Sequence, residues 1–256
     1  MKGISFPKSW ALISGGKDSL STAQALHEAG KLEGCVSFET GVSTPDWKPF
    51  VEKVCAERKW PLEFYKTPES YDDLVLEFGF PGPGRHKKFM DRLKGRCVRA
   101  FKKVHPDAIL ASGTRGGESK RREIGTSPVS MWETMPIIAP IYDWSTEETW
   151  AFFRDRGFER APGYSTLQVS GDCLCGAFAR EGEREALEFH YPALGERFRK
   201  LTEYLTPKRA VSGRHLWGWG WRQPVKKDKQ TSALCVECGD ADPAEPGTLC
   251  QRKRIR

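Results

Sequence analysis

The chain has 256 residues, a formal net charge of +7 and a hydrophobic fraction of 38%. This length suits one large α/β domain, or such a domain with a smaller addition. No apolar run approaches the roughly 18 residues of a membrane span, and the segment from Met1 to Pro7 lacks the apolar core of a signal peptide. These features exclude a helical membrane protein and predict a soluble protein of the cytoplasm. There, eight cysteines indicate metal or redox ligands, because the cytosol keeps thiols reduced.

An anion-binding turn is predicted near the start of the chain. The apolar run 10–13 ends in Ser14-Gly15-Gly16-Lys17-Asp18-Ser19, and the residues after it have the apolar spacing of a helix. Two glycines allow a phosphate to approach the backbone, and the first N–H groups of the helix point at it. Lys17 adds a cation, while Ser14 and Ser19 can donate hydroxyl hydrogen bonds.

The turn lacks the spacing of a Walker A motif, which needs four residues between its first Gly and the Gly-Lys pair. It resembles the PP-loop of the ATP pyrophosphatase superfamily, whose members cleave nucleotides between the α and β phosphates. The resemblance implies that the nucleotide phosphates are bound by Ser14, Gly15, Gly16, Lys17, Asp18 and Ser19. Lys17 and the loop N–H groups would stabilise phosphate charge during cleavage, and Asp18 would hold Mg²⁺.

The first half of the chain alternates strands and helices. We expect a helix to about residue 30, a strand over 34–41, a helix over 45–59 and a short strand over 62–65. This order predicts a parallel, Rossmann-like sheet with its ligand beyond the carboxyl ends of the strands, where the loop and Thr40-Gly41 fall. Residues 68–85 have no clear assignment. A basic helix over 86–104 and a buried strand over 108–113 follow. Cys35 and Cys55 lie in apolar patterns and are expected in the core.

Later motifs narrow the resemblance. Three segments are similar in order and spacing to the PAPS reductase branch of that superfamily. They are residues 96–102, Gly113-Thr114-Arg115 with Glu118-Ser119, and Pro140 to Ser145. The resemblance implies that Gly113 and Arg115 close the nucleotide site; the alternative for Arg115 is a structural ion pair with Glu118. Residues 145–148 form a capping box that begins another helix.

The positive charge is concentrated in two places. Residues 85–122 contain thirteen Lys and Arg but three acids, a net charge of +10, and the chain ends in a second basic run at 252–256. Such patches suit a polyanion, either nucleotide phosphates or a nucleic acid. The alternative is a solvated helix face and a charged tail.

Two cysteine pairs predict a metal centre. Cys173 and Cys175 form a C-x-C pair, and Cys235 and Cys238 form a C-x-x-C pair near the end of the chain. Zinc and an iron–sulfur cluster both fit such ligands. Resemblance to sulfur-handling and DNA-modifying relatives favours a 4Fe–4S cluster on these four residues, with Cys97 or Cys250 as substitutes.

The remaining elements complete a C-terminal helical, Cys-rich extension. We expect helices over 183–191 and 194–204, and a Trp-Gly repeat at 217–221 that packs against the domain, the alternative being base stacking. The predicted boundaries are 1–160 for the nucleotide-binding domain and 161–256 for the extension.

These observations predict an enzyme that uses ATP, or PAPS or APS, to activate a substrate. The expected reaction is sulfur transfer to a nucleic acid or a small molecule, with a sulfur donor protein as a further partner. One alternative is reduction of an adenylyl or phosphoadenylyl sulfate. For this, Glu237-Cys238-Gly239 resembles the start of the catalytic arm of those reductases but lacks the His that follows it. The other alternative is a nucleic-acid-binding module with a structural metal.

Overall fold

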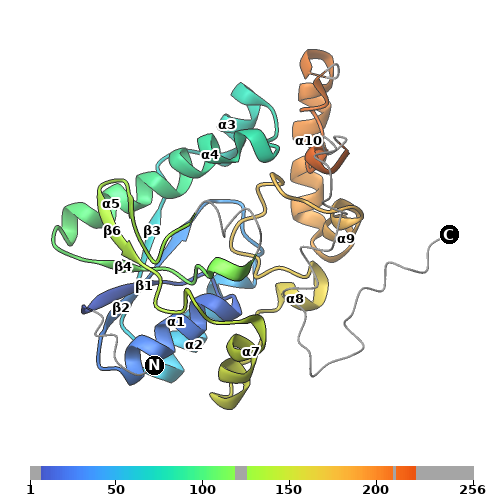
Figure 1. The fold of residues 1–256 in the computed structure, drawn as a ribbon. Helices are drawn as coiled ribbons and strands as arrows, with labels where there is room; N and C mark the ends of the chain where they lie inside the picture. Colours follow the sequence, from blue (N-terminus) through green and yellow to red (C-terminus); the bar gives the residue numbers. More distant parts are fainter. Residues whose placement is uncertain (1–6, 119–125, 210–211, 223–256) are drawn as a thin grey trace, which may run out of the picture.

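A six-stranded sheet forms the centre of the protein, in a computed structural model that describes residues 7–118, 126–209 and 212–222 (Figure 1). Its strand order is β3-β2-β1-β4-β6-β5, parallel except for β5, which runs antiparallel to β6. The strands are β1 (Ser9–Leu12), β2 (Leu32–Glu39), β3 (Leu62–Lys66), β4 (Leu110–Ala111), β5 (Val129–Trp132) and β6 (Met135–Ile138). The predicted α/β class with a parallel sheet is confirmed.

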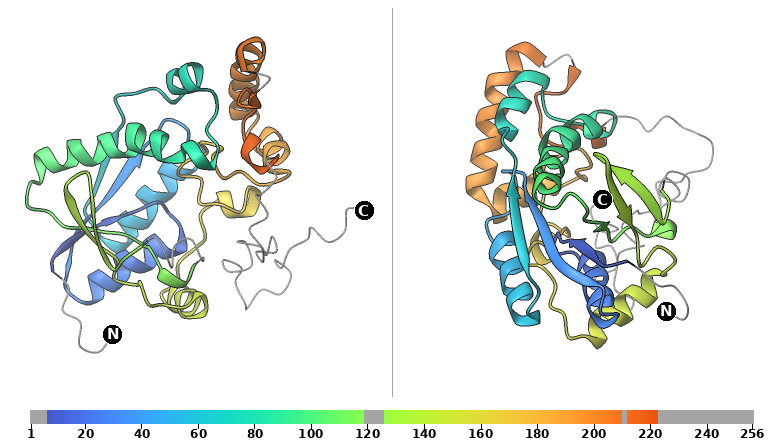
Figure 2. Two further views of the ribbon diagram at one scale, coloured as in Figure 1. Left: turned by 45° about the horizontal axis from the view of Figure 1, so that its top comes forward. Right: turned by 90° about the vertical axis from the view of Figure 1, so that its left-hand side faces the viewer.

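Helices cover both faces of this sheet, and each face has its own apolar core (Figure 2). One face is covered by α1 (Lys17–Glu28), α2 (Trp47–Arg58) and α7 (Thr146–Asp155). The other is covered by α5 (Arg96–Val104). Cys35 and Cys55 are buried in the first of these cores, as expected. No helix in the described ranges combines the length and the apolar character that a membrane crossing requires.

The predicted basic helix is continuous in space over 86–104. It consists of α4 (His86–Met90), the π-helical turn η2 (Asp91–Gly95) and α5. Its buried side chains recur every four residues and include Phe89, Leu93, Cys97 and Phe101. This stripe packs onto the sheet and onto the C-terminal elements, so the cations are directed to the flanks of the helix.

A third core lies beside the carboxyl ends of the strands. It combines α3 (Tyr71–Phe78) and α4 with α9 (Glu183–His190), α10 (Pro192–Arg209) and Trp217. Four short helical elements lie in the connections between these longer ones: η1 (Pro83–Arg85), η3 (Gly116–Glu118), α8 (Gly163–Thr166) and η5 (Trp219–Arg222). Residues after 160 therefore share a core with elements from the first half of the chain, and the boundary at 160 remains a prediction.

Helix α3 and the β5–β6 hairpin were not predicted from the sequence. Helix α3 lies in the unassigned segment 68–85 and begins at Ser70, whose hydroxyl accepts hydrogen bonds from the N–H groups of Asp72 and Asp73. The β5–β6 hairpin turns at Glu133-Thr134, where both residues have positive φ, 49° and 66°. Such turns are usually marked by Asn-Gly or Asp-Gly, and this one has neither. The strand predicted over 108–113 is shorter than expected, with only Leu110–Ala111 in the sheet.

The predicted capping box at the start of α7 is present, and it provides a test of the fold. Ser145 Oγ accepts from the Glu148 N–H at 3.0 Å, and Glu148 Oε2 accepts from the Ser145 N–H at 2.7 Å. We expect Ser145→Ala to lower the free energy of unfolding by about 1 kcal/mol, the usual cost of losing a cap. Urea denaturation measures this change. Ser130→Ala on the exposed strand β5 is the control, and equal stability of the two variants would contradict the assignment.

Candidate functional site

The loop between β1 and α1 has the geometry of an anion site. Gly15 has φ of +79°, a conformation that side chains other than glycine disfavour. Ser19 Oγ donates to the Gly16 carbonyl at 2.8 Å and accepts from the Ser14 N–H at 3.2 Å, which holds the loop closed. Helix α1 begins after Gly16, which offers no capping side chain. An anion held in the loop would meet the N-terminus of α1, where the helix dipole favours negative charge.

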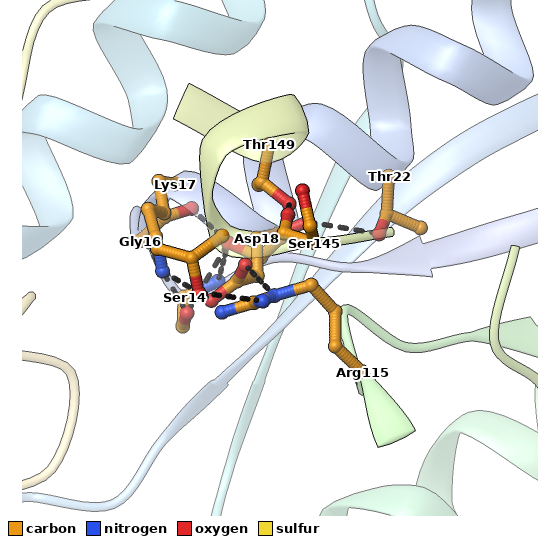
Figure 3. A network of polar contacts seen from close by, with 10 residues as sticks. Ser14, Gly16, Lys17, Asp18, Thr22, Arg115, Ser145 and Thr149 are labelled. Carbon is orange, nitrogen blue, oxygen red and sulfur yellow. Dashed lines mark hydrogen bonds and ion pairs between the residues drawn. The ribbon is translucent and has the colours of Figure 1, made fainter. Parts of the chain in front are cut away.

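Asp18 lies between two buried cations (Figure 3). Its Oδ2 is 3.0 Å from Lys17 Nζ and its Oδ1 is 2.8 Å from Arg115 Nε, and the two cationic side chains are only 3% and 1% exposed. Arg115 also donates to Thr146 Oγ1 at 3.1 Å. Arg115 therefore joins the loop after β4 to the phosphate loop and to the start of α7; that it closes a nucleotide site stays a prediction.

A cleft of about 280 Å³ opens beside this loop, at the carboxyl ends of the strands. Its walls include Ser14, Asp18, Ser19 and Gly113 from the predicted nucleotide site, and also Trp47, whose indole N–H donates to the Ser14 carbonyl at 3.0 Å. A methyl group on Gly113 would lie 2.7 Å from the Asp18 carbonyl carbon. The absence of a side chain at Gly113 therefore lets β4 approach the first turn of α1 closely.

Six of the ten predicted nucleotide ligands do not line this cleft: Gly15, Gly16, Lys17, Thr40, Gly41 and Arg115. Lys17 is buried behind the loop, with its ammonium 5.5 Å from the centre of the Trp150 ring. Thr40 is buried and lines a second cavity instead. The Gly41 carbonyl accepts a hydrogen bond from Arg197 at 2.7 Å. Thr40 and Gly41 therefore contact the second cavity and helix α10.

The segment that contains Cys173 and Cys175 is tied to the loop after β2 by backbone hydrogen bonds. The Thr44 N–H donates to the Gly171 carbonyl at 2.9 Å, and the Leu174 N–H donates to the Val42 carbonyl at 2.7 Å. The Ser43 hydroxyl donates to the Asp172 carbonyl at 2.8 Å. These bonds bring Cys173 and Cys175 to the same edge of the sheet as the phosphate loop.

Both cysteines line a cavity of about 300 Å³, whose other walls are mostly apolar and include Phe89, Leu93 and Phe178. The hydrogen bond with Cys175 and the nearby Lys94 ammonium lower the pKa of the Cys173 thiol to about 7, against the opposing effect of burial. The same hydrogen bond, together with burial, raises the pKa of Cys175. The pair therefore favours one thiolate at neutral pH, the form that binds metals and acts as a nucleophile.

Lys94 and Asp172 join the two cavities. Lys94 lines both of them, and its Nζ lies 2.6 Å from Asp172 Oδ2, while Asp172 lines the nucleotide cleft. Burial lowers the pKa of Lys94, but the Asp172 carboxylate and Cys173 more than offset this, so the pKa lies above its ordinary value and the ammonium remains charged. Neither residue was predicted: Lys94 is one of many cations in its helix, and no local pattern distinguishes it.

The other cysteines predicted as possible metal ligands lie either in a buried helix or outside the described residues. Cys97 is buried, and its thiol donates to the Leu93 carbonyl within the helix. Cys235, Cys238 and Cys250 lie outside the described residues. Within the described ranges, no three His, Cys, Asp or Glu side chains are grouped closely enough to hold a metal ion. Cys173 and Cys175 alone are thus an incomplete ligand set.

The basic segment is neutralised in part by acids from other elements. Glu69 pairs with Arg92 and Arg96, and Glu133 pairs with Arg99. These acids precede or follow residues 85–122, so the sequence count of +10 overstates the charge that this face presents. Binding of a nucleic acid there stays a prediction, as does binding by the C-terminal run, which is not described.

The close packing at Gly113 predicts that a larger residue at this position weakens ATP binding. Gly113→Ala places a methyl group against the backbone of the first turn of α1. Overpacking of this kind usually costs about 1–3 kcal/mol, and the turn that moves is the one that faces the anion. We expect at least a fivefold weaker ATP affinity by isothermal titration calorimetry. Gly117→Ala is the matched control, since its added methyl would meet nothing within 4 Å; equal affinities for the two variants would contradict the packing argument.

Similar solved structures include the phosphate complex of phosphoadenylyl-sulfate (PAPS) reductase from Candida auris, which is 16% identical over 61% of this chain and 76% of that chain, with a TM-score of 0.46. Candida glabrata FMN adenylyltransferase, in complex with FMN and the ATP analogue AMPCPP, is 12% identical over 62% of this chain and 51% of that chain, with a TM-score of 0.45. No curated protein matches the sequence.

The family assignment comes from the sequence match. Residues 8–169, more than half of the chain, match the family model described as the phosphoadenosine phosphosulfate reductase domain. The match spans the phosphate loop, the Gly113 to Arg115 segment and the start of α7, which carried the resemblance to the PAPS reductase branch. The chain belongs to the phosphoadenosine phosphosulfate reductase domain family.

Proposed function

We propose that this protein binds ATP in the cleft beside Ser14–Ser19, cleaves it between the α and β phosphates and so activates an acceptor for sulfur transfer. The main support for this proposal is that the cleft beside the phosphate loop and the cysteine cavity share a wall. Lys94 lines both the nucleotide cleft and the cysteine cavity, next to Asp172 and Cys173. A group activated at the α phosphate would therefore lie close to Cys173, where the sulfur chemistry is expected.

The chemical step is an adenylyl transfer. An acceptor oxygen attacks the α phosphorus, the bond from that phosphorus to the bridging oxygen breaks, and pyrophosphate leaves with the electron pair. The N–H groups at the start of α1 and the Lys17–Asp18–Arg115 cluster would stabilise the phosphate charge. The sulfur of a thiocarboxylate on a donor protein would then attack the acceptor carbon that bears the adenylylated oxygen, and AMP would leave with the electron pair of the carbon–oxygen bond. Hydrolysis of the resulting thioester would return the donor carboxylate and leave the sulfur on the acceptor.

Mg²⁺ is the expected companion of the triphosphate. Asp18 lines the cleft, but each of its oxygens already accepts a hydrogen bond from a cation. The ion would have to use the remaining lone pairs of Asp18 and the phosphate oxygens, an arrangement in keeping with the few carboxylates that Mg²⁺ usually needs. No step in this proposal depends on the ion.

The chemistry of the cysteine pair fits a thiolate-bound cluster. Cys173 and Cys175 lie within hydrogen-bond distance of one another, the Ala177 N–H donates to Cys175, and Lys94 provides a compensating positive charge. We propose a 4Fe–4S cluster held by Cys173, Cys175, Cys235 and Cys238, with zinc as the alternative metal. When bound, such a cluster supplies electron transfer or a site for sulfur. Lys94 would hold the cysteine segment beside the cleft in either case.

Reduction of an adenylyl sulfate is the second candidate, and the family assignment favours it. It would require a catalytic thiol, for which Cys238 is the candidate by its sequence context. The two reactions differ in product: pyrophosphate from ATP in one, and thiol-dependent sulfite from a sulfonucleotide in the other. A binding module without catalysis would yield neither product.

The first test is pyrophosphate release from ATP in the presence of candidate acceptors. We expect Lys17→Ala to lower the rate at least a hundredfold, because it removes a buried cation from the phosphate loop. Lys53→Ala, which removes an exposed lysine that pairs with Glu159 on the surface, should retain the wild-type rate. Unchanged pyrophosphate release in Lys17→Ala would refute the assignment of the loop. Sulfite production abolished by Cys238→Ser would instead establish the reductase.

The second test is metal content after anaerobic purification. We expect about four iron and four sulfide per chain and absorption near ~400 nm, as is usual for Cys-ligated iron–sulfur centres. The double variant Cys173→Ser, Cys175→Ser should lose the metal, whereas Cys55→Ser, in the buried core, should keep it. A colourless protein with one zinc per chain would exclude the cluster and leave the nucleotide chemistry untouched.

A further inference from the structure

Three aromatic side chains line the cleft beside the phosphate loop, and they do not have the same surroundings. They are Phe38, Trp47 and Trp132. The Trp47 indole N–H donates to the Ser14 carbonyl, so this ring is tied to the loop. Phe38 and Trp132 instead contact one another, with ring centroids 6.1 Å apart and an angle of 72° between the planes. We call these two rings the aromatic corner of the cleft.

The contact between Phe38 and Trp132 spans most of the sheet. Phe38 belongs to β2, Trp132 belongs to the edge strand β5, and three strands lie between them in the sheet order. Because neighbouring strands are about 4.8 Å apart, β2 and β5 would be about 19 Å apart in a flat sheet. The two rings pack in the same apolar core, so the hairpin must turn over the face that α5 covers. A residue of the edge strand thereby lines a cleft that opens at the middle of the sheet.

The basic helix holds the hairpin in this position. Lys102 Nζ donates to the Thr134 hydroxyl oxygen at 2.7 Å and to the Thr134 carbonyl at 3.1 Å, and Arg99 pairs with Glu133. Gly95 has no side chain where Glu133 lies on the helix, since a methyl group there would be 2.8 Å from a Glu133 carboxylate oxygen. The turn of the hairpin is therefore fixed to the helix at three points.

Trp132 itself is anchored on one side and open on the other. It pairs across the hairpin with Met135, which is fully buried, whereas the Trp132 side chain is only half-buried. Its indole N–H donates to no acceptor in the part of the chain that the structure describes, although buried indole N–H groups usually have one. No hydrogen bond thus fixes the orientation of this ring, and a small rotation would let the N–H donate to a ligand in the cleft.

The aromatic corner suits the base of a nucleotide. Neither ring carries a charge, so the corner offers nothing to a phosphate, which the N-terminus of α1 attracts instead. A purine is flat and stacks on aromatic side chains, and its ring nitrogens, such as N7, accept hydrogen bonds. The loop and the corner therefore provide separate walls for the phosphates and for the base.

We propose that Trp132 contacts the base of the nucleotide, so that the β5–β6 hairpin forms the base-binding wall of the cleft. The inference rests on the nucleotide site proposed above, but it requires neither cleavage of the nucleotide nor a metal at the cysteines. It also assigns a structural task to two cations of the basic segment, Arg99 and Lys102, which hold the hairpin over the cleft.

Calorimetric titration with ATP and with inorganic triphosphate separates the base from the phosphates. Trp132→Ala should weaken ATP binding about 5- to 150-fold, the range that corresponds to loss of one aromatic side chain stacked on a base. It should leave the affinity for triphosphate within about twofold of wild type, because the phosphate loop is untouched. Met131→Ala, at an exposed position of the same strand, is the matched control and should change neither affinity.

Two further variants distinguish a lost base contact from a general loss of structure. Trp132→Leu keeps apolar bulk beside Phe38 and Met135, and it should show the same selective loss of ATP affinity. Trp132→Phe removes one indole from the cleft. The quenching of tryptophan fluorescence by ATP, measured in excess of that by triphosphate, should therefore be smaller in Trp132→Phe than in wild type.

Wild-type ATP affinity in both Trp132→Ala and Trp132→Leu would overturn the base contact. An equal loss of ATP and triphosphate affinity would also overturn it, since Trp132 would then shape the cleft as a whole. A wild-type protein that binds neither ligand would overturn the nucleotide site together with this inference. Selective loss of ATP affinity in a protein that releases no pyrophosphate would support the base contact and refute only the proposed cleavage.

Discussion

Asp18 holds two buried cations in the phosphate loop, and the functional edge of the sheet depends on that interaction. Lys17 and Arg115 would each incur a desolvation cost of several kcal/mol if no opposite charge lay beside them. The shared carboxylate offsets this cost and joins the end of β1 to the loop after β4 and to α7. It also leaves the cluster with a net charge of about +1 rather than +2. Phosphate binding must therefore rely on the N–H groups at the start of α1 as much as on the lysine.

The second constraint is the pairing of two loops far apart in sequence. Residues 42–44 hold residues 171–174 by main-chain hydrogen bonds, which is possible because both segments lie at the carboxyl end of a parallel sheet. These bonds join residues after 160 to the loop after β2, and two of those residues, Tyr164 and Ser170, lie close to Gly16 of the phosphate loop. Loop and cysteine pair form one site with two cavities, separated by the Lys94–Asp172 ion pair.

The parts of this site that the sequence predicted are those marked by a motif of residues adjacent in the chain. The strand, glycine turn and helix at 10–23 and the capping box at Ser145 are local, and so is the cysteine pair. The partners of these elements are not local. Asp172 follows Gly171 in a turn, and nothing nearby in sequence indicates that it would pair with Lys94, 78 residues earlier. Thr40 was predicted to be a nucleotide ligand from its place at the end of β2; in the fold it lines the cysteine cavity, and its role as a ligand stays a prediction. The hairpin at 129–138 was missed because Val129 and Met131 are exposed on an edge strand and give no inward–outward alternation.

The basic segment shows why a charge count does not identify a partner. Residues 85–122 carry a net charge of +10, against +7 for the whole chain, a composition typical of polyanion binding. In the fold, Glu69 and Glu133 from outside the segment pair with three of these arginines, Asp172 pairs with Lys94, and Arg115 is buried against Asp18. Much of the charge therefore ties the helix to its neighbours or faces the two cavities, where the field of a cation acts over a few ångströms in a partly dry site. A long nucleic acid backbone would instead need cations spread along an open face. The charge count alone therefore does not decide between a nucleotide and a nucleic acid as the partner.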